Sequence, residues 1–132
     1  MEKKYSKGEI EDMITKKVIK FYLHTLRVGP KEAKTYIIDD MIIVRLKGQL
    51  LPIEKILLKD HSGLSLVKDI RSLLHAITTN EMTSIISNLT NHKIISTHSD
   101  VSTKTGEIVE IFVLDANYEK ELITKNKNQS SL

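Results

Sequence analysis

The segment 108–114 constrains the fold of this chain more than any other feature. Apolar residues occupy both sets of its alternating positions, with Ile108, Phe112 and Leu114 on one side and Val109, Ile111 and Val113 on the other. Successive side chains of a strand point to opposite faces of its sheet, so this strand is apolar on both faces. We therefore expect a central strand, covered on each side by helices or by a partner subunit.

Two hairpins can supply the neighbours that a central strand needs. In the first hairpin, the β-branched runs 35–38 and 41–47 are separated by Asp39 and Asp40. Asp tolerates the positive φ that a two-residue hairpin turn requires. In the second hairpin, strands at 93–97 and 107–114 flank the polar loop 100–106. The two hairpins together predict a four-stranded antiparallel sheet.

A helix with clear end signals precedes the first hairpin. Ser6 and Glu9 have the three-residue spacing of a capping box, which predicts a helix from Ser6 to about Arg27. Gly29 can adopt the left-handed conformation that ends a helix, and Pro30 cannot continue one. This pair therefore predicts the helix C-terminus.

Two further helical patterns lie between the hairpins, after the break at Gly48. Pro52 predicts the first position of a short helix, in which Glu54 would satisfy free backbone amides and the helix dipole. Apolar residues then recur at helical spacing over 64–89, interrupted by the polar segment 78–81. This pattern fits equally one helix with a weak middle or two abutting helices. Asn91 stands where a left-handed stop residue is expected.

The predicted order of elements is helix, hairpin, helix, helix, hairpin. Helices packed on one face of the sheet give a two-layer α+β domain. A length of 132 residues fits one domain, which we expect over residues 1–115. After Asp115 apolar residues thin out, so residues 116–132 are predicted to form a polar, flexible C-terminal tail.

Composition excludes several classes of function. The chain has no cysteine, so a disulfide framework and a thiolate metal site are excluded, as expected for a protein of the reducing cytoplasm. No apolar run approaches the ~20 residues of a transmembrane helix. The formal charge is +3, and the basic excess lies within residues 1–34. Acidic residues dilute this excess, which favours a solvated helix face over a nucleic-acid interface.

Catalytic, metal and cofactor signatures are absent from the sequence. The five histidines include no i, i+4 pair, and the five glycines are scattered singly. The run His98-Ser99-Asp100 has the letters of a hydrolytic triad, but consecutive strand residues point to alternate faces. Asp100 is instead expected to cap the backbone amide of Ser102 or Thr103. We therefore predict no catalytic residue, no metal site and no cofactor.

A small anion patch is a weaker candidate site. It would form from Arg45, Lys47 and Arg71 if the first hairpin and the long helix are adjacent. The favoured alternative is that these cations pair with Asp69, Glu54 or Asp39.

The ordered motifs resemble one bacterial family. They comprise a helix that ends at Gly-Pro, the segment Gly48-x-Leu50-x-Pro52-x-Glu54, a long helix with Arg71, and strands that end in Ser99-Asp100 and Leu114. In this order they are similar to the MpsC-like family, named for a Na+-translocating membrane-potential-generating system, over about residues 8–115. The candidate motif residues taken from this resemblance are Gly29, Pro30, Gly48, Pro52, Glu54, Arg71 and Asp100.

The chain departs from the family pattern at three places. Arg27-Val28 stand where the family usually has a second glycine, Leu51 replaces a usual Thr, and Asn91 replaces a usual Gly. Leu51 has no hydroxyl to cap the short helix, which leaves Glu54 to hold that turn.

The resemblance implies a function without a catalytic residue. It implies a soluble cytoplasmic partner of a membrane ion or inorganic-carbon transport system. We expect a non-enzymatic accessory or regulatory protein, a homodimer that acts by protein contact. The alternatives are a small-ligand- or nucleic-acid-binding regulator that uses the basic N-terminal helix, and an enzyme whose polar site gathers Asp100, His98 or Arg45.

Overall fold

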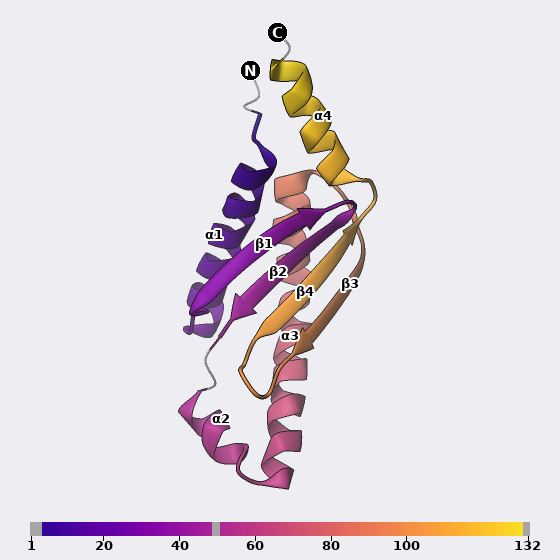
Figure 1. The fold of residues 1–132 in the computed structure, drawn as a ribbon. Coiled ribbons are helices and arrows are strands. Elements are labelled where there is room, and N and C mark those ends of the chain that lie inside the picture. The colour runs from indigo at the N-terminus through magenta and orange to yellow at the C-terminus, as the bar shows by residue number, and fades with distance from the viewer. Residues whose placement is uncertain (1–3, 49–50, 131–132) are drawn as a thin grey trace.

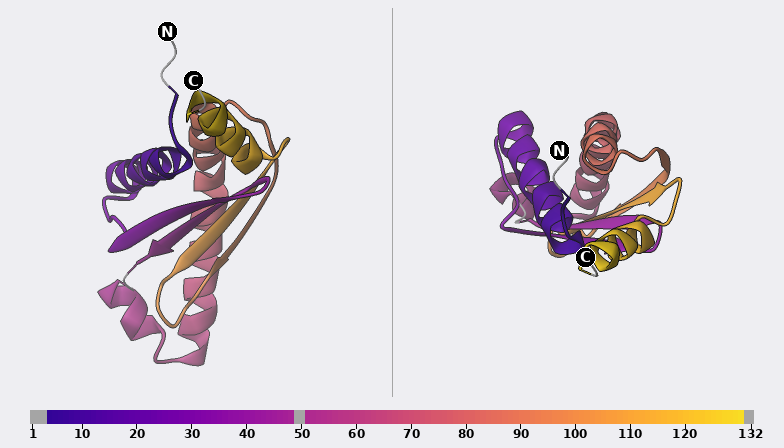
Figure 2. Two further views of the ribbon diagram at one scale, coloured as in Figure 1. Left: turned by 45° about the horizontal axis from the view of Figure 1, so that its top comes forward. Right: turned by 90° about the horizontal axis from the view of Figure 1, so that it is seen from above.

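The protein is a two-layer α+β domain, as predicted. The computed structural model describes residues 4–48 and 51–130; Leu50 of the family motif lies outside these ranges. Its elements are α1 (Lys7–Leu26), β1 (Glu32–Ile38), β2 (Met41–Lys47), α2 (Pro52–Leu57), α3 (His61–Thr90), β3 (Ile94–Val101), β4 (Ile108–Leu114) and α4 (Tyr118–Ser130). Helices α1 and α3 cover one face of the sheet, and no helix of the described residues covers the other face (Figures 1 and 2).

The four-stranded antiparallel sheet has the order β1-β2-β4-β3. Strand β4 is therefore central, as its two apolar faces predicted, and it pairs with both β2 and β3. The turn of the first hairpin lies at Asp39, whose φ is 54°, with Ile38 opposite Met41. Strand β3 continues to Val101, four residues beyond its predicted end, so Asp100 belongs to a strand rather than to a loop.

Helix α1 begins as predicted and ends differently. The capping box of Ser6 and Glu9 is formed, but the left-handed residue is Arg27, with φ 62°. Gly29 has a different role. A Cβ at this position would lie 2.7 Å from Cδ2 of Leu23, so the absence of a side chain lets the backbone pass close to α1.

Helix α3 is one continuous helix of 30 residues, which decides between the two alternatives left open by the sequence. The hydroxyls of Thr78 and Thr79 both donate to the carbonyl of His75, so the polar segment is accommodated within the helix. The helix ends at Asn91, whose φ is 58°, as predicted.

The hydrophobic core lies between the sheet and the two long helices. Its largest fully buried side chains include Ile14, Ile42, Met82, Ile86 and Phe112. The residues of α3 that enter this core all belong to its C-terminal half. The N-terminal half of α3 extends past the end of the sheet, together with α2 (Figure 1).

The C-terminal segment differs from the predicted flexible tail. Residues 118–130 form α4, and Tyr118 and Leu122 are buried in the core. The carboxylate of Glu119 accepts hydrogen bonds from Nζ of Lys7 and from the backbone amide of Asp39. Tyr118 and Leu122 are four residues apart, so they lie on the same side of α4 and pack together against the core. Within the described ranges, no helix is long and apolar enough to cross a membrane.

Candidate functional site

A cavity of about 360 Å³ lies where the end of α1, helices α2 and α3, and the β3–β4 loop meet. Five of the seven motif residues line it, namely Gly29, Pro30, Gly48, Glu54 and Arg71. Its walls are largely aliphatic, and they include Leu26, Val28, Leu46, Leu51, Leu74, Val101 and Ile108. A volume of this size, with apolar walls and few polar groups, is typical of a small-molecule site. We call it the motif cavity.

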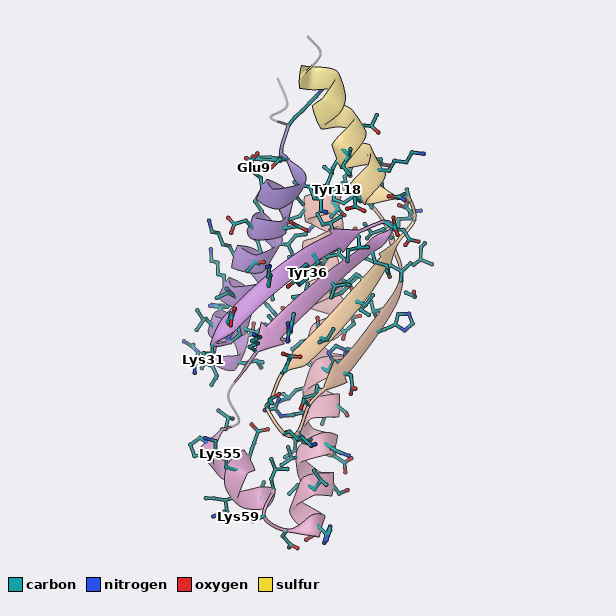
Figure 3. All side chains as sticks on the ribbon, in the orientation of Figure 1. Glu9, Lys31, Tyr36, Lys55, Lys59 and Tyr118 are labelled. Carbon is teal, nitrogen blue, oxygen red and sulfur yellow. The ribbon has the colours of Figure 1, made fainter. Side chains whose placement is uncertain are left out.

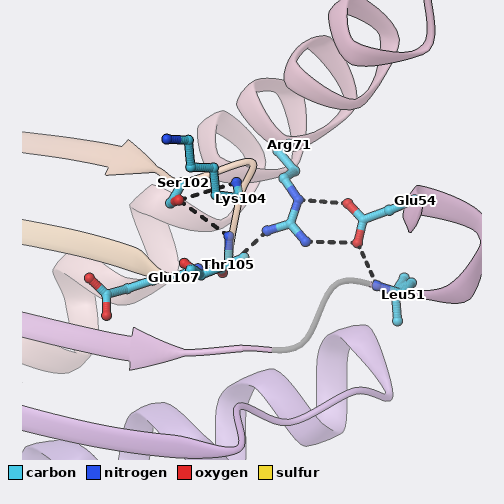
Figure 4. A network of polar contacts seen from close by, with 8 residues as sticks. Leu51, Glu54, Arg71, Ser102, Lys104, Thr105 and Glu107 are labelled. Atoms are coloured by element: carbon cyan, nitrogen blue, oxygen red, sulfur yellow. Dashed lines mark hydrogen bonds and ion pairs between the residues drawn. The ribbon is translucent and has the colours of Figure 1, made fainter. Parts of the chain in front are cut away.

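A bidentate ion pair holds one side of the motif cavity (Figure 4). Nε and Nη2 of Arg71 lie 2.6 and 2.7 Å from the two carboxylate oxygens of Glu54. The same carboxylate accepts the backbone amide of Leu51 at 2.9 Å, so Glu54 holds the turn that lacks a hydroxyl cap. Hydrogen bonding from Arg71 lowers the pKa of Glu54. The pair therefore ties α2 to α3 while both groups are charged.

Two glycines, Gly48 and Gly106, line the motif cavity next to this ion pair. A Cβ on Gly48 would lie 3.3 Å from the carbonyl oxygen of Gly106, and Gly106 has φ 79°. Nη1 of Arg71 lies 3.5 Å from the same carbonyl oxygen. The end of β2, the β3–β4 loop and α3 thus meet at one point, where larger side chains would separate them.

The three cations of the candidate anion patch are not brought together. Arg45 and Lys47 lie on the open face of the sheet, where they pair with Glu107 at 3.0 Å and Glu32 at 3.7 Å. Arg71 lies on α3 and pairs with Glu54, one of the alternatives that the sequence offered.

The remaining motif residues lie beside the motif cavity rather than in it. Pro52 is the first residue of α2, as predicted. Asp100 lines a neighbouring cavity of about 320 Å³ together with Lys68 and Arg71. Its carboxylate accepts the amide of Val101, and the loop cap expected of Asp100 is made by Ser102, whose hydroxyl accepts two amides of the turn (Figure 4).

A buried carboxylate is the main feature that the sequence analysis missed. Glu110 lies on the inner face of β4 between Ile108 and Phe112, and it is 1% exposed. Nδ1 of His75 lies 3.0 Å from Oε1 of Glu110, in poor alignment, and neither carboxylate oxygen has a well-directed hydrogen-bond donor in the described part of the chain. Burial raises the pKa of Glu110, against the opposing effect of His75. A charged residue at an inward-facing strand position was the available signal.

The same cluster extends to Tyr22 and Ser99. Burial, and then the neighbouring Glu110 charge, raise the pKa of Tyr22 above its ordinary value. Nε2 of His75 lies 2.5 Å from Oγ of Ser99, which stands opposite Glu110 in the sheet. Tyr22 and His75 both line the motif cavity, so this polar cluster forms one end of its wall.

The order Ser99, His75, Glu110 is that of a hydrolytic triad. In such a triad the acid is ionised, whereas burial of Glu110 favours its neutral form. Ser99 also lies within a strand, whose backbone amides point along the sheet rather than toward a substrate above it. The arrangement instead links α3 to the edge strand. Of the groups proposed for an enzyme, Arg45 pairs with Glu107, and the carboxylate of Asp100 accepts the backbone amide of Val101.

The fold and the cavity together describe a small α+β domain that has a ligand-sized apolar site beside a buried carboxylate. Residues 6–116 match the family model described as "Na+-translocating membrane potential-generating system (MpsC)". The chain belongs to this family. It is 39% identical over 119 residues to "Uncharacterized protein YbcI" of Bacillus subtilis (strain 168). The aligned region covers 90% of this chain and 96% of that relative. No solved structure matches it significantly.

Proposed function

We propose that this protein is a non-enzymatic accessory component of a membrane-potential-generating system in the cytoplasm, and that it acts as a binding protein. Family membership supports the link to that system. The motif cavity is the observation that carries the binding role, because the residues of the family motif gather around it.

The cavity favours a small molecule with an apolar body and one polar group. Aliphatic walls would bury the body, and the few polar groups, chiefly Arg71, His75 and Tyr22, would orient the ligand. Arg71 is already paired with Glu54, so a charged ligand group would have to compete with that carboxylate. A ligand bound here contacts α2 and α3 at once, and its occupancy can therefore alter the surface that these helices present to a partner.

The ligand role is tested by two-dimensional ¹H–¹⁵N NMR with a fragment library that contains neutral, carboxylate and amine fragments. We expect saturable shifts at the amides of Gly48, Arg71 and Gly106. A Val28→Trp variant fills the cavity mouth and should abolish them. Ile95→Trp, an equivalent change on an exposed aliphatic residue of β3, should leave them intact. No saturable shift with any fragment would contradict the proposal.

The non-enzymatic role is tested separately with a fluorophosphonate probe, which labels activated serines. We expect no labelling of the wild-type protein. Labelling that disappears in Ser99→Ala would contradict this part of the proposal and would assign a nucleophile to the His75 cluster.

The association with a membrane system is tested by affinity purification from the native cell after mild cross-linking. We expect to recover a subunit of a membrane ion or inorganic-carbon transporter. Recovery of nucleic acid, or of this chain alone, would contradict the accessory role.

A further inference from the structure

The outer face of α3 carries an apolar stripe in the half of the helix that extends past the sheet. Leu66, Ile70, Leu73 and Ile77 are 45–64% exposed. Their spacing of four, three and four residues places them in one line along the helix. The residues that α3 turns toward the sheet, such as Met82 and Ile86, lie on the opposite side. We call these four residues the outer stripe.

The outer stripe ends where α3 begins to cover the sheet. The next residues on the same side are Asn80, Ser84 and Asn88, which are polar and exposed. The apolar outer surface is thus confined to one half of a continuous helix. A contiguous exposed apolar patch of this kind is typical of a contact surface, whereas exposed aliphatic residues without a binding role are usually scattered singly over a protein surface.

We propose that the outer stripe is the interface of a homodimer, in which α3 packs against α3 of a second copy. A four-three-four spacing is the a/d pattern of a coiled-coil seam, whose knobs fit the holes of an identical helix. A two-fold contact places the same patch on both subunits, which one short stripe can satisfy. Helix α3 has two basic and two acidic residues, so two copies meet without net repulsion.

The area available supports a stable contact of this kind. Outside the motif cavity, the α2–α3 hairpin exposes six large aliphatic side chains at 45–65%, namely Ile53, Ile56, Leu66, Ile70, Leu73 and Ile77. A fully exposed Leu or Ile offers on the order of 100 Å² of apolar area, so these six side chains present roughly 350 Å². Because homodimer interfaces are about 65% apolar, this apolar area corresponds to an interface of roughly 540 Å² per subunit, close to the lower limit of about 600 Å² for specific interfaces.

This surface differs from the one that the sequence indicated. The expectation of a dimer rested on the second apolar face of β4, formed by Val109, Ile111 and Val113. These side chains lie on the open face of the sheet but are only partly exposed, because neighbouring strands shield them. Tyr36 lies on this face (Figure 3), and Nζ of Lys34 lies 5.1 Å from the centre of the Tyr36 ring. The outer stripe is more exposed and carries no charge.

Sedimentation velocity from about 1 to 100 µM tests the proposal. We expect a wild-type dimer and a monomer for Leu73→Lys, with a dissociation constant raised at least tenfold. Leu73 is exposed, so circular dichroism should show an unchanged fold. Asn80→Lys on the same side of α3 is the matched control and should remain dimeric. A wild-type monomer at 100 µM, or a dimer that Ile111→Lys dissociates and Leu73→Lys does not, would overturn the proposal.

Disulfide trapping gives an independent test because the chain has no cysteine. In an antiparallel contact centred on the outer stripe, Leu73→Cys lies close to its copy. Ser84→Cys lies about 19 Å along the helix from the centre, since each residue rises 1.5 Å. We expect mild oxidation to cross-link Leu73→Cys and to leave Ser84→Cys monomeric on a denaturing gel. Cross-linking of Ser84→Cys alone would place the contact elsewhere and overturn the assignment.

Discussion

The two halves of α3 belong to one helix and have opposite patterns. In the C-terminal half, Met82 and Ile86 are buried against the sheet and the outer side is polar. In the N-terminal half, Leu73 and Ile77 are exposed on the outer side. The C-terminal half follows the usual pattern of a surface helix, with an apolar side toward the core and a polar side toward solvent. The N-terminal half has the pattern of a helix whose outer apolar side has no packing neighbour.

Length explains why the halves differ. A helix of 30 residues is about 45 Å long, whereas strands of seven or eight residues span about 25 Å. The sheet cannot cover the whole helix, and the short α2 covers only part of what remains. The uncovered half is therefore available for binding, and the motif cavity lies at the junction between the halves.

Truncation of one side chain in each half of α3 should give the largest difference in stability between the two halves. Met82→Ala leaves a cavity in the core and should lower the free energy of unfolding by about 2–5 kcal/mol. Leu73→Ala removes an exposed side chain and should change the stability of the monomer by less than about 0.5 kcal/mol. Urea unfolding at 1 µM or below measures both. Equal losses at the two sites would show that the N-terminal half is part of the same core.

Removal of the ion pair at the junction should have the next largest effect. Arg71 and Glu54 have side chains that are only 15% and 12% exposed, so Arg71→Ala leaves a poorly solvated carboxylate. We expect a loss of about 2 kcal/mol in the free energy of unfolding. Arg45→Ala, which breaks a more exposed pair with Glu107, is the control and should cost about 0.5 kcal/mol. Equal losses would mean that the junction pair is ordinary surface charge.

These features were not equally predictable from the sequence. The capping box of Ser6, the turn at Asp39, the end of α3 at Asn91 and the central position of β4 depend on local chemistry, and all were predicted correctly. Tyr118 and Leu122 were missed because two apolar residues in a polar segment give little periodicity. The motif cavity and the Glu110 cluster depend on contacts between distant segments, which local patterns do not specify.

The buried carboxylate at the junction should make stability depend on pH. Because the pKa of Glu110 is raised in the folded state, its contribution is present below its unfolded pKa of about 4.3 and is lost as pH rises through the folded value. The Glu110→Gln variant keeps the shape of the side chain and removes this pH-dependent loss of stability. Relative to wild type, the variant should gain about 1 kcal/mol between pH 4 and pH 8. Glu32→Gln, on an exposed carboxylate, should show no such gain.

A smaller effect of pH on stability is expected beyond the C-terminal end of α3, where neighbouring carboxylates rather than burial raise a pKa. Nδ1 and Nε2 of His92 lie 2.7 and 2.9 Å from Asp115 and Glu121. Burial alone would lower the pKa of His92, but these two carboxylates raise it. The stabilisation should be complete below pH 6.5, the ordinary His value, until Asp115 protonates below about pH 4. It should disappear as pH rises through the folded value.

The His92→Gln variant measures this contribution. It should be less stable than wild type by about 0.5–1 kcal/mol at pH 5.5 and equal to it at pH 9. His98→Gln on the open face of the sheet is the control. A difference that grows with pH would contradict the assigned sign.

Amide hydrogen–deuterium exchange along α3, measured at 1 µM and at 100 µM, shows directly which half of the helix is covered when two copies associate. We expect the protection of residues 64–77 to increase with protein concentration and the protection of residues 78–90 to be the same at both concentrations. Protection that does not change in either half, or that increases on β4 instead, would contradict the claim that the uncovered half of α3 is the binding surface.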